Sequence, residues 1–319
     1  MRIIFTLVLC SVSFCSRGQV TGCTDKAASN YNPRASINNG SCIYTPVSVT
    51  PELKFLQPPV LEENSGMIFW NNMLWQHNDS GGEAAIYAID TLGNTMQRRV
   101  ILKGAVNIDW EDIAQDDTHI YIGDFGNNLN GARTNLKIYK IAKKDILDTA
   151  EFKIFVQPET ISFRYEDQPD TPSVVTVNTT DIDCEAMISC YDKLYLFTKQ
   201  WKRNKTILYE LDKTAGVQVA ARKDSLDVGG LITGADIDIT KGRIVLTGYT
   251  LSAGRFIYLL YDYPRKNFFG GNKRKITLNG LCQTESVAFK KEGYIYLGSE
   301  SFSVMKQRME SLNLDAFFK

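Results

Sequence analysis

Histidine is the scarcest reactive residue in this chain of 319 residues, with two copies, His77 and His119. Seven cysteines are present, but they do not stand at the Cys/His spacings that zinc sites use. No Gly-x-Ser-x-Gly elbow precedes a predicted helix. The sequence therefore excludes a zinc-finger type of site and argues against a serine hydrolase.

Charge of one sign and long apolar runs are also missing. The chain has 36 basic and 36 acidic residues, and no block of lysine and arginine stands out. This balance argues against nucleic acid or an anionic membrane surface as a partner. After the first residues no apolar run is long enough to cross a bilayer, so we expect no membrane span. Aromatic residues make up 11% of the chain, which favours an all-β fold.

The first 18 residues have the pattern of an export signal. One positive charge, Arg2, precedes a short apolar run, and small residues stand near Gly18. We expect residues 1–18 to be a signal peptide, and the mature protein to be secreted or to lie at the cell surface or in the periplasm. Cys10 and Cys15 leave a lipid anchor as the alternative.

An acid-led unit recurs along most of the chain. It consists of a short apolar strand and then an alternating strand, and its two marker positions lie ten or eleven residues apart: Ser65 and Trp75, Glu111 and Tyr121, Glu185 and Tyr195, Ala235 and Val245, Glu285 and Tyr296. Repeats of about 50 residues are typical of array folds such as propellers. We predict an all-β protein, a β-propeller of five blades with four strands each, with six blades as the alternative. A two-sheet sandwich has a similar strand content but no reason for such a repeat.

The last unit has three obvious strands, and the missing one is predicted at Leu53–Leu56. Pairing the front of the domain with its end would close the ring and remove an exposed edge. The propeller domain is then expected over residues 52–319. Residues 46–51 contain two prolines and no charge, and are predicted to be a linker.

Residues 19–45 form a separate small module. They contain Gly22-Cys23-Thr24-Asp25, Asn30-Tyr31-Asn32-Pro33 and Gly40-Ser41-Cys42-Ile43-Tyr44. This pattern resembles short modules attached to many secreted bacterial proteins. Because so short a segment cannot bury a core, we expect a Cys23–Cys42 disulfide to hold it together. Asp25 and its asparagines could offer oxygens to calcium, but a stapled spacer is the preferred interpretation.

Five motifs of the repeat resemble a family. They are Ser65-Gly66-Met67-Ile68 with His77-Asn78-Asp79-Ser80-Gly81-Gly82, Asp109–Ala114 with Gly123–Asn128, Asp183-Cys184-Glu185-Ala186, Thr233-Gly234-Ala235-Asp236, and Gln283-Thr284-Glu285-Ser286. They are similar to motifs of secreted bacterial propellers of the phytase-like and lactonase-like kind, most of them uncharacterised. The resemblance spans residues 60–300 and implies the fold more than an activity.

One face of such a ring should collect the chemistry, because the first strand of each blade begins there and the second ends there. Carboxylates that converge need a cation, and calcium accepts carboxylate and amide oxygens. The predicted metal ligands are Glu111, Glu185, Glu285, Asp236, Asn78 and Asn127. The predicted ligand-binding residues are Asp79, Asp124, Lys199, Trp201 and Tyr249. The alternative is a structural role, in which each glutamate only accepts backbone hydrogen bonds from the next blade.

Two functions compete on this evidence. The first is a binding or interaction protein, expected to be a monomer, whose acidic channel holds calcium and whose partner is a small molecule or a surface polymer. The second is a calcium-dependent hydrolase of a lactone, ester or phosphoester, with His77 or Glu185 as the catalytic base.

Overall fold

The computed structural model describes residues 18–93, 95–169, 175–290, 293–301 and 305–318. The predicted signal peptide lies, apart from Gly18, outside these residues. The fold is all-β, as predicted, with one short α-helix, α1 (Lys143–Leu147). None of the helices in the described ranges is long and apolar enough to span a bilayer.

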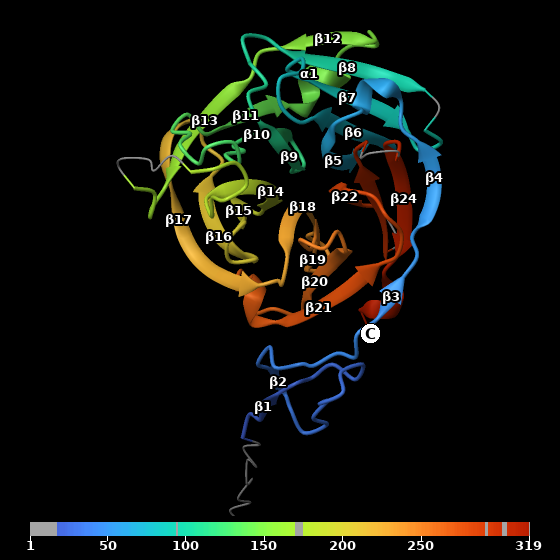
Figure 1. Cartoon of the computed structure of the whole chain (residues 1–319), viewed down its shortest axis with the longest axis vertical. Coiled ribbons are helices and arrows are strands. Elements are labelled where there is room, and N and C mark those ends of the chain that lie inside the picture. The colour runs from blue at the N-terminus through green and yellow to red at the C-terminus, as the bar shows by residue number, and fades with distance from the viewer. Residues whose placement is uncertain (1–17, 94, 170–174, 291–292, 302–304, 319) are drawn as a thin grey trace, which may run out of the picture.

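Five antiparallel meanders lie around a common axis (Figure 1). The first contains β5 (Asn64–Trp70), β6 (Met73–Asn78), β7 (Ala85–Asp90) and β8 (Met96–Leu102). The second contains β9 (Trp110–Gln115), β10 (His119–Asp124), β11 (Lys137–Ala142) and β13 (Glu159–Tyr165). The third contains β14 (Asp183–Cys190), β15 (Lys193–Lys199), β16 (Lys205–Asp212) and β17 (Gly216–Asp227).

The fourth meander contains β18 (Leu231–Asp238), β19 (Arg243–Tyr249), β20 (Arg255–Tyr261) and β21 (Asn272–Leu278). The fifth contains β22 (Thr284–Phe289), β23 (Tyr294–Ser299) and β24 (Arg308–Asn313), together with β4 (Glu52–Leu56) from the front of the domain. The antiparallel pairing of β4 with β24 confirms the predicted closing strand. Short 3₁₀ turns lie at Pro59–Leu61, Phe268–Gly270 and Asp315–Phe317.

The first strands of the meanders contact one another in cyclic order. β5 contacts β9, β9 contacts β14, β14 contacts β18, β18 contacts β22, and β22 contacts β5. The outer strands β13 and β17 pair in parallel, so the second and third meanders form one eight-stranded sheet whose two end strands, β9 and β14, also touch. This sheet therefore nearly closes on itself.

The core lies between successive meanders. Trp75 of the first meander and Trp110 of the second are fully buried in one apolar cluster. Similar clusters follow between each later pair, and Phe55 on β4 belongs to the cluster between the fifth meander and the first. Because each sheet buries both faces against its neighbours, the first and second strands read as nearly continuous apolar runs.

Most of the connection from residue 143 to 182 builds structure at the rim of the ring: α1, β12 (Lys153–Val156), which pairs in parallel with β8, and β13. Its last part does reach the predicted face, because Asn178 lines the cavity described below. Residues 170–174 fall outside the described part of the chain.

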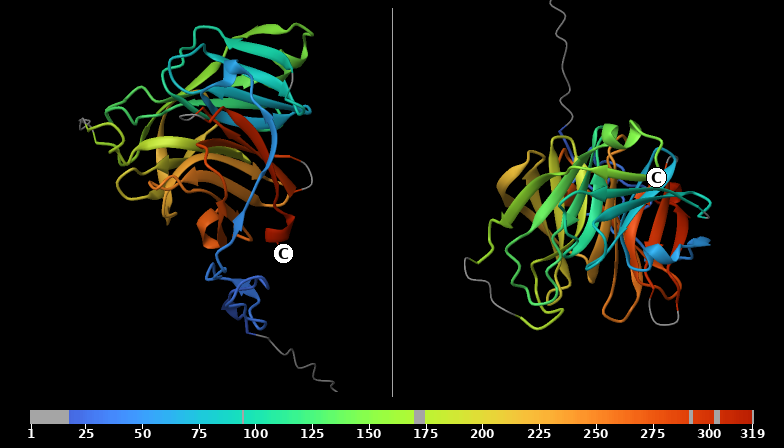
Figure 2. Two further views of the ribbon diagram at one scale, coloured as in Figure 1. Left: turned by 45° about the vertical axis from the view of Figure 1, so that its right-hand side comes forward. Right: turned by 90° about the horizontal axis from the view of Figure 1, so that it is seen from above.

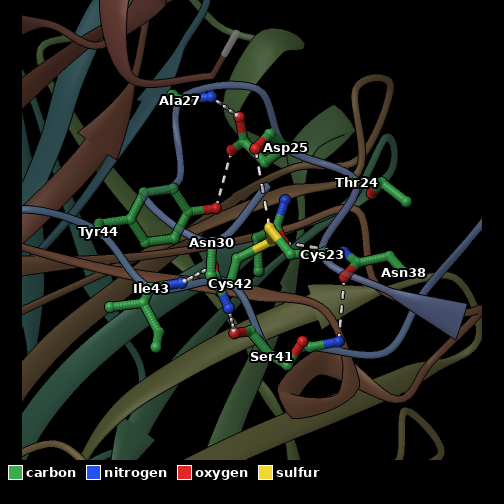
Figure 3. Close-up of a disulfide and its surroundings, with 12 residues drawn as sticks. Cys23, Thr24, Asp25, Ala27, Asn30, Asn38, Ser41, Cys42, Ile43 and Tyr44 are labelled. Atoms are coloured by element: carbon green, nitrogen blue, oxygen red, sulfur yellow. Dashed lines mark hydrogen bonds between the residues drawn. A yellow bond between two sulfur atoms is a disulfide. The ribbon is translucent and has the colours of Figure 1, made fainter. Parts of the chain in front are cut away.

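The N-terminal module lies beside the fourth meander (Figure 2). It contains a parallel pair of two-residue strands, β1 (Thr21–Gly22) and β2 (Ile37–Asn38). The predicted disulfide between Cys23 and Cys42 is present (Figure 3). Asp25 Oδ2 accepts a hydrogen bond from Tyr44 Oη at 2.8 Å within the module and from Tyr261 Oη at 2.6 Å on β20.

Residues 46–51 are more than the predicted linker. β3 (Ser48–Val49) pairs in parallel with β21, and Val47 and Val49 pack against the core of the fourth and fifth meanders. The module is thus tied to the ring by a strand and by side chains. Side-chain oxygens of the module that could bind calcium accept hydrogen bonds from nearby backbone groups. Asn30 Oδ1 accepts from Ile43 N at 2.8 Å, and Asn38 Oδ1 accepts from Gly40 N at 3.0 Å.

Candidate functional site

Each first strand of the ring has a β-bulge near its start. The bulged residues are Ser65, Glu111, Glu185, Thr233 and Glu285. A bulge bends its strand and re-aims the side chain at that position. Four of these residues, all but Thr233, line a single cavity of about 440 Å³ at the mouth of the central channel.

The fourth bulged residue differs from the one that the repeat spacing predicts. The spacing predicts Ala235, whereas the structure has Thr233, whose hydroxyl donates to Thr284 O at 2.8 Å. The turn between β18 and β19 covers residues 239–242, longer than the turn of residues 71–72 between β5 and β6. Counting back ten residues from Val245, as the repeat spacing does, therefore misses the bulged residue by two positions.

This two-residue difference explains why Asp236 is not a site residue at this mouth. It lines a different cavity, of about 710 Å³, which is bordered by the turns that join first and second strands at the other end of the ring. Its Oδ2 accepts a hydrogen bond from Phe289 N at 2.7 Å on the next meander. Asp236 thus fits the alternative role, that of an acid that links neighbouring strands.

The ends of the second strands complete the mouth. Asp79, Lys199, Tyr249 and Glu300 follow or end β6, β15, β19 and β23, and all four line the cavity together with Trp201. Asp109 and Asp183 lie beside them, because each stands two residues before a bulged glutamate and has a carboxylate oxygen within 4.8 Å of an oxygen of that glutamate. Neither aspartate is among the predicted ligands, although the Asp-x-Glu spacing was a signal for both.

Seven carboxylates converge at this mouth: Asp79, Asp109, Glu111, Asp183, Glu185, Glu285 and Glu300. Ligand oxygens of Asp79, Asp109 and Glu111 lie within 4.8 Å of one another, and so do those of Glu111, Asp183 and Glu185. Among the described residues the cations that pair with them are Lys199 and Arg133. The mouth therefore has more negative groups than its own cations can neutralise.

Lys199 is the cation inside the cavity. Its Nζ lies 3.0 Å from Glu185 Oε1, and the two residues are 4% and 3% exposed. The ammonium group also lies over the rings of Trp201, at 4.6 Å, and Tyr249, at 5.3 Å. Burial by itself would lower the pKa of Lys199, but Glu185 and the other acids nearby raise it well above its usual value.

Burial and mutual repulsion make these acids hold their protons. Burial first, and then the neighbouring carboxylates, together raise the pKa of Asp79 to about 6, that of Asp109 to about 7 and that of Glu300 to about 8. For Glu111 and Glu185 the same causes raise the pKa well above the usual range. Glu285 has a pKa of about 7, raised by burial against the attraction of Lys199. A bound cation would relieve this repulsion.

Besides Asp236, two predicted site residues lie outside the cavity wall. His77 is fully buried, pairs with Gly66 across the sheet and packs edge-on against Trp110, so it lies inside the core and away from the cavity wall. Burial lowers the pKa of His77 to about 4. Asn78 donates a hydrogen bond to Val60 O at 2.7 Å, and is no part of the cavity wall.

Two others support the site from behind. Asn127 N donates to Asp183 Oδ1 at 2.7 Å, and its own Oδ1 accepts from Arg133 N at 2.9 Å. Asp124 accepts from Arg133 Nη2 at 2.7 Å and from Asp109 N at 3.2 Å. Both residues were predicted to contact a ligand or a metal, and the structure places them as supports of Asp109 and Asp183.

The residues present fit a calcium ion. Calcium binds oxygen ligands at about 2.3–2.6 Å, so two oxygens on one ion lie at most about 5 Å apart, and both acidic triads meet that limit. Gly126 leaves the room that the acids need, because a Cβ there would collide with the carboxylates of Glu111 and Asp109. Glu285 adds an Oε1 that is buried without a hydrogen-bond partner among the described residues.

Comparisons with known proteins define no family for this chain. No protein-family model and no curated protein matches it. Among solved structures, hydrazine synthase from Kuenenia stuttgartiensis aligns with a TM-score of 0.41 at 10% identity, covering 82% of this chain and 66% of that one. The mitotic checkpoint complex aligns at 0.36 and 13%, covering 76% and 62%. An exo-β-1,3-galactanase from Phanerochaete chrysosporium aligns at 0.49 and 7%, covering 89% and 64%. The chain spans slightly less than two thirds of each.

Proposed function

We propose that this chain is an exported β-propeller of five blades that binds calcium at its channel mouth and, through the ion and the cavity wall, a small molecule or surface polymer. The five meanders are the blades, and β4 closes the fifth. The resemblance of the repeat motifs to secreted bacterial propellers supports this proposal. So does the disulfide of the N-terminal module, which suits an oxidising compartment.

The observation that carries the calcium proposal is that five carboxylates line one cavity, with Asp109 and Asp183 beside them and with Lys199 and Arg133 as their cations. The guanidinium of Arg133 is already bound to Asp124 and to Gly126 O, each at 2.7 Å, and is 3.7 Å from Asp109. Glu185 is paired with Lys199, but Asp79, Glu111, Glu285 and Glu300 remain in excess. A divalent ion supplies the missing positive charge.

The cavity wall suits a ligand with a polar end and an apolar part. Trp201, Tyr249, Leu251 and Leu281 form one side of the mouth, and Leu251 and Leu281 are mostly exposed to solvent. The acids and Lys199 form the floor. A molecule whose oxygens reach the floor would lay its apolar part against these side chains.

A calcium-dependent hydrolase is the second candidate. One observation favours it: acids at the mouth have pKa values between about 6 and 8, so they can give or take a proton near neutral pH. His77 lies in the core, so the catalytic base would be a carboxylate. Glu185, which Lys199 holds in place, is the candidate for this role. A bound calcium ion would polarise the carbonyl or phosphoryl oxygen of the substrate.

Calcium titration with a thermal melt tests the proposal. Millimolar calcium should raise the melting temperature of the wild type above its value in chelator, since the ion binds the folded state alone. Glu111→Gln should remove most of that rise because Glu111 belongs to both triads, whereas Glu159→Gln, on an exposed strand position, should keep it. A wild type whose melting temperature is the same in calcium and in chelator would refute the calcium site.

A panel of lactone, ester and phosphoester substrates then separates the two candidates. Calcium-dependent turnover that Glu111→Gln abolishes and Glu159→Gln retains would favour the hydrolase. A calcium response without turnover of any of them leaves the binding protein as the function.

A further inference from the structure

We propose that the channel mouth contains two overlapping cation positions and that the Lys199 ammonium group permanently fills one of them. This inference rests on the proposed calcium site and states its stoichiometry, one calcium ion per chain. Lys199 is then the residue that determines how many ions the mouth accepts.

The two positions follow from the arrangement of the acids. Asp79, Asp109 and Glu111 form one triad, and Glu111, Asp183 and Glu185 form the other. Glu111 is common to both, so its carboxylate lies between them. A shared carboxylate between two groups of ligands is the arrangement that two-metal sites use.

The second triad already has a cation of the protein in contact with it. Lys199 Nζ lies 3.0 Å from Glu185 Oε1, and Trp201 holds Lys199 in place, because its Nε1 donates to Asp183 Oδ2 at 2.8 Å while its ring lies under the ammonium group. Asp183 also accepts from Asn127 N at 2.7 Å. A divalent ion at this position would have to displace a buried ammonium ion.

The first triad has no cation held as closely. Its nearest guanidinium, that of Arg133, lies 3.7 Å from Asp109 and is bound to Asp124. Asp79 accepts a hydrogen bond from the N–H of Ser80, the next residue in the chain. On the cavity wall, Glu285 is 6% exposed and its Oε1 has no hydrogen-bond partner among the described residues, so the cavity retains negative charge that Lys199 does not satisfy.

Counting bound ions by isothermal titration with calcium tests this assignment. The wild type should bind one ion per chain. Lys199→Met, which has a similar length and no charge, should bind two, and Lys199→Arg, which keeps the charge, should bind one. Lys202→Met is the matched control on the same loop, exposed and outside the cavity lining, and should bind one.

The outcomes separate the two proposals. A wild type that binds no calcium refutes the proposed function together with this inference. A wild type that binds one ion and a Lys199→Met variant that also binds one leave the calcium site standing and refute the role of Lys199. A wild type that binds two ions refutes it as well.

A second measurement applies if Lys199→Met does not fold. Asp79→Asn changes the first triad alone and Asp183→Asn the second alone. In the wild-type background Asp79→Asn should weaken calcium binding by about tenfold or more, the usual loss at a metal site, and Asp183→Asn should weaken it less. The reverse order would refute the assignment.

Discussion

At the residue scale, the same side chain type has opposite environments at equivalent bulges. Glu185 is buried against the ammonium group of Lys199, whereas Glu285 Oε1 is buried without a hydrogen-bond partner among the described residues. The two glutamates look alike in the repeat. Their difference comes from the residue at the end of the neighbouring second strand, a lysine on β15 and a serine on β23.

This difference predicts opposite effects of the same substitution. In chelator at about pH 8, above the pKa of Glu285 of about 7, Glu285→Gln should stabilise the fold by on the order of 1 kcal/mol, because burial of this carboxylate costs more than the attraction of Lys199 offsets. Glu185→Gln should destabilise it by about 3 kcal/mol, because it leaves Lys199 buried without its closest partner.

Chemical denaturation of both variants and of Glu159→Gln as the neutral control measures these effects. If Glu285→Gln and Glu185→Gln shift stability in the same direction, the paired and unpaired states assigned to these acids are wrong.

At the element scale, β4 joins the first meander to the fifth. It pairs with β24, and Phe55 inserts among Met67 and Leu74 of the first meander and Met309 of the fifth. Gly93 lies against the Phe55 ring and, with a φ of +76°, has a backbone conformation that favours glycine. One strand thereby stabilises two meanders that are far apart in sequence.

Phe55→Ala should accordingly cost about 3 kcal/mol, the usual loss for a buried phenylalanine. Leu53→Ala on the same strand should cost much less, because Leu53 is 53% exposed whereas Phe55 is 9% exposed. Denaturant unfolding of both variants measures the difference. Equal losses would mean that the pairing of β4, and not the packing of Phe55, closes the ring.

At the scale of the whole molecule, the buried acids couple stability to pH in an unusual direction. The pKa values of Asp109, Asp236 and Glu285 are raised to about 7 and that of Glu300 to about 8, so the folded state holds protons that the unfolded chain has released. Stability from these groups is fully present below their unfolded pKa values, near 4, and is lost as pH rises through about 7 to 8.

In chelator, the melting temperature should therefore fall between about pH 6.5 and pH 8.5. His77 acts in the opposite sense, because its lowered pKa, about 4, costs stability as pH falls below about 6.5, and it leaves this window unaffected. Calcium should flatten the fall, since it takes the place of the protons at the channel mouth. A melting temperature that rises across this window in chelator would contradict the raised pKa values.

Local pattern was enough to predict much of the fold. Most first strands of the repeat begin with an acid, and the apolar pattern of each segment can be seen without knowing what it packs against. Four of the five bulged positions, the closing strand and the disulfide could therefore be predicted. The bulged glutamates carried their own signal, an acid at the head of an apolar strand. Asp109 and Asp183 carried it too, two residues earlier.

Tertiary structure alone decided the partners of these acids. Whether His77 faced the cavity depended on Trp110 of the next meander, and the side of the ring that holds Asp236 depended on the length of one turn. Lys199 pairs with Glu185 because of the register of β14 with β15. Its ammonium group lies over the Trp201 ring because of the loop that follows β15. The repeat determined that Glu111, Glu185 and Glu285 reach the channel mouth, because each heads the first strand of its unit. Which charges neutralise one another depends on distances of a few ångströms between strands and loops, and only the folded chain sets these.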